Sequence, residues 1–212
     1  MIYAVTNIKG GVGKTTTAIH FAAALQVLGP TLLLDGDDRT RSASAWDERA
    51  KERGKPLPFR VAYESHGTKI ARDYEYVVID TGQKPSHDDL KDLAGYCDLL
   101  IVPAVPTYLD IDGTALTINA LRSLGIAAYR VLLNMVKPPN EPEGAELRAD
   151  LLSSGIPLFA EGIPELKVFD KATAAGTIVG DKEFFNRNDA PRAARAWAAY
   201  KSAVQEMTEN AR

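Results

Sequence analysis

Cysteine is nearly absent from this chain. Cys97 is the only one among 212 residues, which excludes internal disulfides and any cluster that needs several thiolates from one chain. A reducing cytoplasm is therefore the expected compartment. Long apolar runs are also missing, since none approaches the roughly 18–20 residues needed to span a bilayer. No basic region precedes an apolar core in the first residues, so we expect no signal peptide.

An overall excess of positive charge is missing as well. The net charge of −3 argues against a protein that binds nucleic acid through its total charge, although a local patch stays open. The run from Arg39 to Arg60 has such a local excess. It is interpreted either as a solvated helix face or as part of a DNA-contacting patch that includes Arg49, Arg53 and Arg60. The acidic tail, Gln205–Arg212, argues against membrane attachment.

Apolar, β-rich runs alternate with amphipathic segments along the chain. The runs lie at Ile2–Thr6, Thr31–Asp35, Tyr76–Asp80, Leu99–Val102, Tyr129–Asn134 and Ile156–Phe159. Helices are predicted near residues 14–28, 86–95, 111–124, 142–153, 164–175 and 190–208. Because the runs are apolar on both sides, the pattern predicts an α/β fold, a mostly parallel sheet with helices on both faces. The length predicts a single domain over residues 1–212.

The stretch Asn7–Thr16, which we call the phosphate loop, joins the first run to the first predicted helix. Three glycines in four positions leave backbone N–H groups free to surround an anion, and the helix directs its positive end at the same point. Lys14 is expected to reach the β- and γ-phosphates of ATP, and the Thr15 hydroxyl to bind Mg²⁺. The alternative is a glycine-rich turn without a ligand. The predicted ATP-binding residues here are Lys9, Gly10, Gly11, Val12, Gly13, Lys14, Thr15 and Thr16.

Aspartates follow two of the apolar runs. Asp35, Asp37 and Asp38 end the second run, and Asp80 ends the third. Carboxylates beside a phosphate site repel ATP unless Mg²⁺ or water intervenes, and a hydrolase uses them to orient the attacking water and to hold the hydrated metal. We therefore predict catalytic roles for Asp37 or Asp38 and metal roles for Asp37 and Asp80. A solvated acidic turn or a helix N-cap is the alternative.

The phosphate loop departs from the ordinary G-x-x-x-x-G-K-[ST] pattern, because Ile8 replaces the first glycine and Lys9 follows it. It resembles the deviant Walker A loop, K-G-G-x-G-K-[ST], of the ParA and MinD family of P-loop ATPases. The resemblance implies that Lys9 reaches the nucleotide held by a second subunit, although a surface lysine is the alternative. The second aspartate of that family's D-x-D-P-Q segment matches Asp37. Asp38 and Arg39 replace its proline and glutamine, which leaves open whether Asp38 shares the role.

The same resemblance extends to the end of a later run. In MinD-like proteins an asparagine at the position of Asn134, beside Met135, hydrogen-bonds the adenine edge. An Ile-Pro segment like Ile163-Pro164 lies against the base. An ordinary turn residue and a loop proline are the alternative interpretation.

The resemblance implies a cytoplasmic, nucleoid-associated ATPase with ATP and Mg²⁺ as its ligands. Its partners would be a second copy of the chain in the ATP-bound state, non-specific DNA and an adaptor protein, ParB- or McdB-like, that stimulates hydrolysis. The resemblance is compatible with plasmid DNA or carboxysomes as the cargo. The Asp-Asp-Arg after the second run favours carboxysomes. A dethiobiotin-synthetase-like ligase and a MinD-like membrane-positioning ATPase are the alternatives.

Lys14→Ala should abolish nucleotide binding, because it removes the one side-chain cation that the loop directs at the phosphates. Isothermal titration with ATP and Mg²⁺ measures this directly. An ATP affinity equal to that of the unmodified chain would contradict the assignment of the loop.

Overall fold

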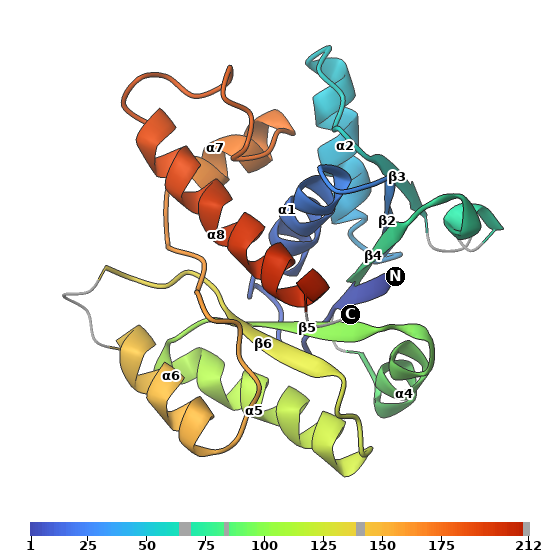
Figure 1. Cartoon of the computed structure of the whole chain (residues 1–212), viewed down its shortest axis with the longest axis vertical. Helices are drawn as coiled ribbons and strands as arrows, with labels where there is room; N and C mark the ends of the chain where they lie inside the picture. The colour runs from blue at the N-terminus through green and yellow to red at the C-terminus, as the bar shows by residue number, and fades with distance from the viewer. Residues whose placement is uncertain (64–68, 83–84, 139–142, 210–212) are drawn as a thin grey trace.

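A six-stranded parallel sheet organises the computed structural model, which describes residues 1–63, 69–82, 85–138 and 143–209 (Figure 1). The strand order is β3-β2-β4-β1-β5-β6. The strands are β1 (Ile2–Val5), β2 (Thr31–Gly36), β3 (Arg60–Tyr63), β4 (Tyr76–Thr81), β5 (Leu99–Ala104) and β6 (Tyr129–Leu133). The predicted parallel α/β fold is therefore confirmed.

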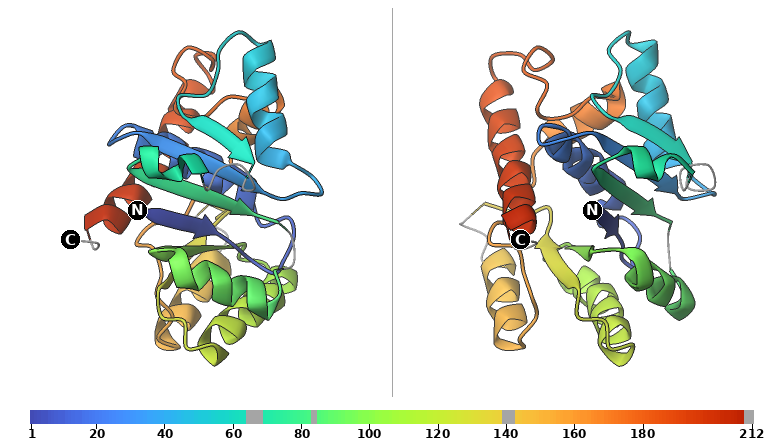
Figure 2. Two further views of the ribbon diagram at one scale, coloured as in Figure 1. Left: turned by 90° about the vertical axis from the view of Figure 1, so that its right-hand side faces the viewer. Right: turned by 45° about the vertical axis from the view of Figure 1, so that its right-hand side comes forward.

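Helices cover both faces of the sheet (Figures 1 and 2). They are α1 (Lys14–Gln26), α2 (Ser42–Glu52), α4 (His87–Tyr96), α5 (Tyr108–Ser123), α6 (Glu143–Ser153), α7 (Val168–Ala175) and α8 (Ala190–Glu209), with a 3₁₀ turn at Ala71–Asp73. Side chains alternate between the faces of a strand. In β1, Tyr3 therefore joins the core under α1, α2, α7 and α8, whereas Ala4 joins the core under α4, α5 and α6. No described helix is long and apolar enough to cross a membrane.

Several details of the predicted secondary structure were wrong. The prediction missed α2 and the short edge strand β3, both of which lie in or next to the basic run. The segment 156–159 is not a strand of the sheet: it makes one bridge, Val131 to Leu158, and Pro157 within it has no N–H to donate to a ladder. Helix α7 begins at Val168 rather than near residue 164, because Pro164 pairs with Val136 in extended form.

A buried histidine holds α1 against the helices behind it. Val179 N–H donates to His20 Nε2 over 3.1 Å, so the proton lies on Nδ1, which donates to the Thr16 carbonyl over 2.7 Å. The ring stacks on Tyr200 of α8 with centroids 4.9 Å apart. Burial lowers the pKa of His20 to about 4, so the ring is neutral near pH 7. The first turn of α1 is thereby fixed to α8.

Helix α7 ends directly against α2. Its terminal glycine, Gly176, has φ of +65°, and a Cβ there would lie 2.4 Å from the backbone nitrogen of Ala50. Trp46 Nε1 donates to the next carbonyl, Thr177 O, over 3.0 Å. This close approach fixes α2, which follows the aspartates of β2.

We expect Gly176→Ala to destabilise the fold by at least about 2 kcal/mol more than Gly155→Ala. Both glycines have φ of +65°, but a Cβ at Gly155 would meet nothing within 4 Å. The strain of the left-handed backbone is therefore matched, and the difference isolates the contact with α2. Urea unfolding of the two variants measures it, and equal free energies of unfolding would contradict the contact.

Candidate nucleotide-binding site

The phosphate loop leaves the carboxyl end of β1 and turns through two left-handed glycines. Gly11 and Gly13 have φ of +79° and +83°, and Gly13 is the N-cap of α1. A Cβ at Gly13 would lie 2.3 Å from Asn134 Nδ2, so only glycine fits the close contact there. Left-handed glycines let successive N–H groups converge on one point, which suits an anion.

Lys14 lies inside this loop, with 7% of the residue exposed. Its Nζ donates to the carbonyls of Asn7 and Lys9, each over 3.2 Å. Burial lowers the pKa of Lys14, while the charges of Asp80 and Asp37 act in the opposite direction. The ammonium group is thus held among carbonyls at the point where a phosphate group would supply a full negative charge.

Asp80 is a carboxylate buried at the end of β4. It is 1% exposed, and neither oxygen has a hydrogen-bond partner among the described residues. Burial raises its pKa to about 7. The Thr15 hydroxyl is close enough to lower that pKa but does not complete a hydrogen bond of good geometry. An unsatisfied buried carboxylate is costly unless a cation or its hydration water approaches it.

These donors fit Mg²⁺. The ion prefers oxygen ligands, keeps several waters and is held by one or two protein groups together with substrate phosphates. Thr15 offers a hydroxyl and Asp80 a carboxylate, next to the loop that suits the phosphates. Among the described residues no group of three or more acidic, histidine or cysteine side chains could hold a metal ion.

Asp35 and Asp37 have different environments although they are two residues apart. Asp35 is buried, and its Oδ2 accepts bonds from the Ser44 N–H and hydroxyl over 2.8 and 2.7 Å, so it fixes the first turn of α2. Asp37 is half-buried and accepts bonds from Arg39 N–H and from both Thr40 donors. Burial raises the pKa of Asp37, but those bonds and the charge of Lys14 outweigh it and lower the pKa overall.

The two candidate catalytic aspartates are thereby distinguished. Asp37 interacts electrostatically with Lys14 and Asp80, and Gly82 after β4 packs against it. Asp38 is exposed on the outer side of the same turn. The position favours Asp37 for orienting water. Asp37 also accepts hydrogen bonds from Arg39 and Thr40, as an aspartate in an acidic turn does. The alternative interpretation, a solvated acidic turn, therefore also describes part of its environment.

The predicted base-side residues lie next to the phosphate loop. Asn134 Nδ2 donates to the Val12 carbonyl over 2.9 Å, and the next residue, Met135, has a left-handed φ of +53°. Val136 N–H donates to Ile163 O over 2.9 Å. Asn134 thus connects the loop to the turn after β6. Ile163 is 1% exposed and packs in the core, so its side chain contributes to the site through the fold.

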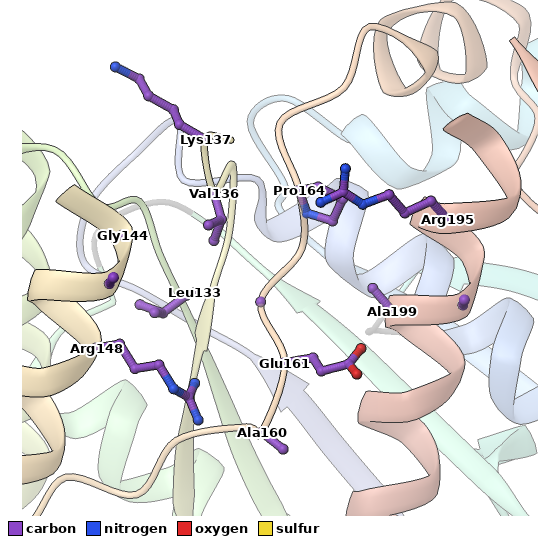
Figure 3. Close-up of a pocket in the computed structure, with 13 residues that line it drawn as sticks. Leu133, Val136, Lys137, Gly144, Arg148, Ala160, Glu161, Pro164, Arg195 and Ala199 are labelled. Carbon is purple, nitrogen blue, oxygen red and sulfur yellow. The ribbon is translucent and has the colours of Figure 1, made fainter. Parts of the chain in front are cut away.

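A cavity of about 560 Å³ opens beside this turn, between α6 and α8 (Figure 3). Its upper end in Figure 3 is lined by Pro164, Val136 and Lys137. Arg148 of α6 and Arg195 of α8 also line the cavity. Its size is that of a small-molecule site. The cavity adjoins the turn after β6 and the segment at Pro164, and no residue of the phosphate loop lines it.

The three arginines of the predicted DNA-contacting patch lie in different surroundings. Arg49 Nε donates to Thr173 O of α7 over 3.0 Å. Arg53 approaches Asp181 at 3.5 Å and lies over the Phe184 ring at 5.2 Å. Only Arg60 of the three is exposed. Arg49 and Arg53 are partly exposed, and their contacts connect α2 to α7 and to the turn after it.

The residues that hold the start of the phosphate loop were not predicted from the sequence. Asn7 is fully buried, and its side chain donates to Pro103 O at the end of β5 over 2.8 Å and accepts from Lys9 N–H over 2.8 Å. Thr117 and Gly113 of α5 contact the same three-residue segment, Asn7 to Lys9. Only the position of Asn7 before the glycines could have indicated such a role.

Residues 3–179 match the model of the CobQ/CobB/MinD/ParA nucleotide binding domain. The chain belongs to this family. A protein named maintenance of carboxysome distribution protein A, from Gloeobacter kilaueensis, is 34% identical over 82% of each chain. A protein of the same name from Halothiobacillus neapolitanus is 27% identical over 83% of this chain and 85% of its own. The fold also matches a plasmid partition protein from Borrelia burgdorferi B31 bound to AMPPNP, with a TM-score of 0.71, 18% identity and coverage of 99% and 98%.

Membership of this family agrees with the deviant loop around Lys9 and Lys14 and with the parallel sheet. The family description names a nucleotide-binding domain, and the matched residues include every group of the site described above, from the phosphate loop to Pro164.

We expect Asp80→Asn to stabilise the nucleotide-free protein more at pH 8 than at pH 5. The folded-state pKa of Asp80, about 7, is above the ordinary 3.8, so the folded chain binds the extra proton and loses stability as pH rises through this window. The substitution removes that loss, roughly 3 kcal/mol (about 1.4 kcal/mol per pKa unit) between the two pH values. Urea unfolding of both proteins at each pH measures it. A stability difference that does not change with pH would contradict the raised pKa.

Proposed function

We propose that this chain is a ParA-type ATPase that hydrolyses ATP with Mg²⁺ and forms an ATP-bound homodimer. The observation that carries the proposal is the juxtaposition of three groups: Lys14 inside the phosphate loop, the unsatisfied carboxylate of Asp80, and Asp37 beside both. A turn without a ligand would have no reason to bury a carboxylate at this cost.

In the proposed reaction the loop N–H groups and Lys14 hold the β- and γ-phosphates, and the N-terminus of α1 adds its dipole. Thr15 and Asp80 would hold Mg²⁺, directly and through water. When bound, that ion would supply positive charge that offsets the negative charge developing on the phosphates during transfer. Asp37, whose pKa is lowered, remains an anion near pH 7 and accepts a hydrogen bond from the attacking water.

Dimer formation depends on Lys9 in this proposal. The residue is half-buried at the edge of the loop, next to the N-terminal half of α5. A lysine that contacts the partner's phosphates only when ATP is bound makes a contact that differs between the two states, which a nucleotide-driven switch requires. Hydrolysis then releases the contact and the dimer.

The relatives support carboxysomes as the cargo, because both named relatives are maintenance of carboxysome distribution proteins. We propose that the ATP-bound dimer associates with nucleoid DNA without sequence preference, and that an McdB-like adaptor stimulates hydrolysis. Arg49 and Arg53 are partly exposed and contact Thr173 and Asp181, whereas Arg60 is exposed, so Arg60 is the most accessible of the three proposed DNA-contacting residues. Plasmid partition would use the same nucleotide cycle.

Asp37→Ala should stop hydrolysis and accumulate the ATP-bound dimer, because water is no longer oriented while the loop and Lys9 stay intact. Asp38→Ala is the matched control on the same turn, and it should retain hydrolysis. Phosphate release and sedimentation velocity with ATP and Mg²⁺ measure the two properties. If Asp38→Ala is the inactive variant and Asp37→Ala hydrolyses normally, the roles are reversed. If the hydrolysis-deficient variant stays monomeric with ATP, the proposed dimer is wrong.

A further inference from the structure

The aliphatic stem of Lys9 lies on a glycine of α5. A Cβ added to Gly113 would lie 2.7 Å from Lys9 Cδ, 2.9 Å from its Cβ and 3.2 Å from its Cγ. Contacts below about 3 Å are strongly repulsive, since carbon atoms prefer separations near 3.5–4.0 Å. Because Lys9 Cβ is attached directly to the loop backbone, rotation of the side chain alone cannot relieve this contact. Gly113 therefore provides the surface on which the lysine stem rests.

One turn further along α5, Thr117 holds the backbone on either side of the lysine. Thr117 Oγ1 accepts from Ile8 N–H over 3.1 Å and donates to Asn7 Oδ1 over 2.9 Å. The same Asn7 oxygen accepts from Lys9 N–H over 2.8 Å. Thr117 is fully buried, so these bonds are not exchanged with solvent. The network fixes the backbone at Lys9, while Gly113 fixes its stem.

We propose that Gly113 and Thr117 are the positioning residues for Lys9, and that α5 thereby sets the direction in which Lys9 leaves the loop. This inference rests on the proposed function, in which Lys9 contacts the nucleotide of the partner. A free lysine side chain loses up to about 2 kcal/mol of conformational entropy when it is immobilised. A stem already seated on α5 reduces that loss at dimerisation. Neither residue is a catalytic residue, because neither is placed at the nucleotide.

The first test compares two helix glycines in the Asp37→Ala background. Gly113→Ala adds a Cβ against Lys9, whereas Gly95→Ala in α4 adds one that meets nothing within 4 Å. Both replace glycine by alanine in a helix at φ outside the left-handed region, so helix propensity favours both variants similarly. The readouts are the dimer dissociation constant with ATP and Mg²⁺ by sedimentation, the ATP affinity of the dilute monomer, and the melting temperature.

We expect Gly113→Ala to weaken dimerisation by at least about tenfold, because a misplaced contact group has effects of this order. The ATP affinity of the monomer should change by less than about threefold, since Lys14 and the loop glycines are not displaced. Gly95→Ala should leave both constants unchanged. A general loss of stability would instead lower the melting temperature and the ATP affinity together.

A second pair of variants tests Thr117 independently of any overpacking at Gly113. Thr117→Val keeps the shape but removes the bonds to Ile8 and Asn7, whereas Thr117→Ser keeps the hydroxyl. We expect Thr117→Val to weaken the dimer and Thr117→Ser to restore it to within about threefold of the parent. Restoration by serine separates positioning from the loss of a buried methyl group.

The outcomes distinguish this inference from the proposed function. If Asp37→Ala alone, saturated with ATP and Mg²⁺, remains a monomer, the proposed dimer fails. If Asp37→Ala dimerises, and Gly113→Ala and Thr117→Val dimerise as tightly, the proposed function stands and the positioning roles are overturned. A dimer weakened equally by Gly95→Ala would also overturn them.

Discussion

The carboxylate of Asp80 has no hydrogen-bond partner within the described part of the chain, although it is buried at the end of β4. Isolated burial of this kind is unfavourable, and the raised pKa reports the cost. The arrangement of the surrounding elements becomes intelligible once a cation is expected there. Lys14, Thr15 and Asp37 contribute to the electrostatics of this one position from the loop after β1 and from the turn after β2. In the proposed function, the stability given up in the free protein is the condition for binding a metal and a triphosphate.

The rest of the fold keeps these groups from rearranging to relieve that cost. Asp35 is in register with Asp80 on the neighbouring strand, but both of its oxygens accept hydrogen bonds, from the Asp37 N–H and from the Ser44 N–H and hydroxyl. The hydrogen bond of His20 to the Thr16 carbonyl fixes the first turn of α1. The hydrogen bond of Asn7 to the Pro103 carbonyl connects the phosphate loop to β5. Buried polar contacts from several elements therefore fix the backbone around the site in the free protein.

The sequence predicted the strand–turn–helix arrangement around Asn7–Thr16 correctly because that motif is local: its glycines, Lys14 and the start of α1 depend only on one another. The alternation of apolar runs with helices likewise predicted the parallel sheet. Contacts between distant segments were not predictable. Thr117 acts on Ile8, 109 positions earlier, and nothing around Thr117 marks it. Arg49 and Arg53 resemble solvated arginines until the packing of α7 on α2 is known. The four-residue strand β3 was too short for its periodicity to be recognised.

We propose that the buried carboxylate of Asp80 destabilises the free protein and that Mg²⁺, bound together with a nucleotide, relieves this cost. The most direct measurement is the pKa of the Asp80 carboxyl by ¹³C NMR, with and without Mg²⁺ and a non-hydrolysable ATP analogue. We expect a pKa near 7 in the free protein and a fall to well below the usual range of an aspartate when both ligands are added. An ordinary pKa in the free protein, or one that does not change on adding Mg²⁺ and the analogue, would contradict it.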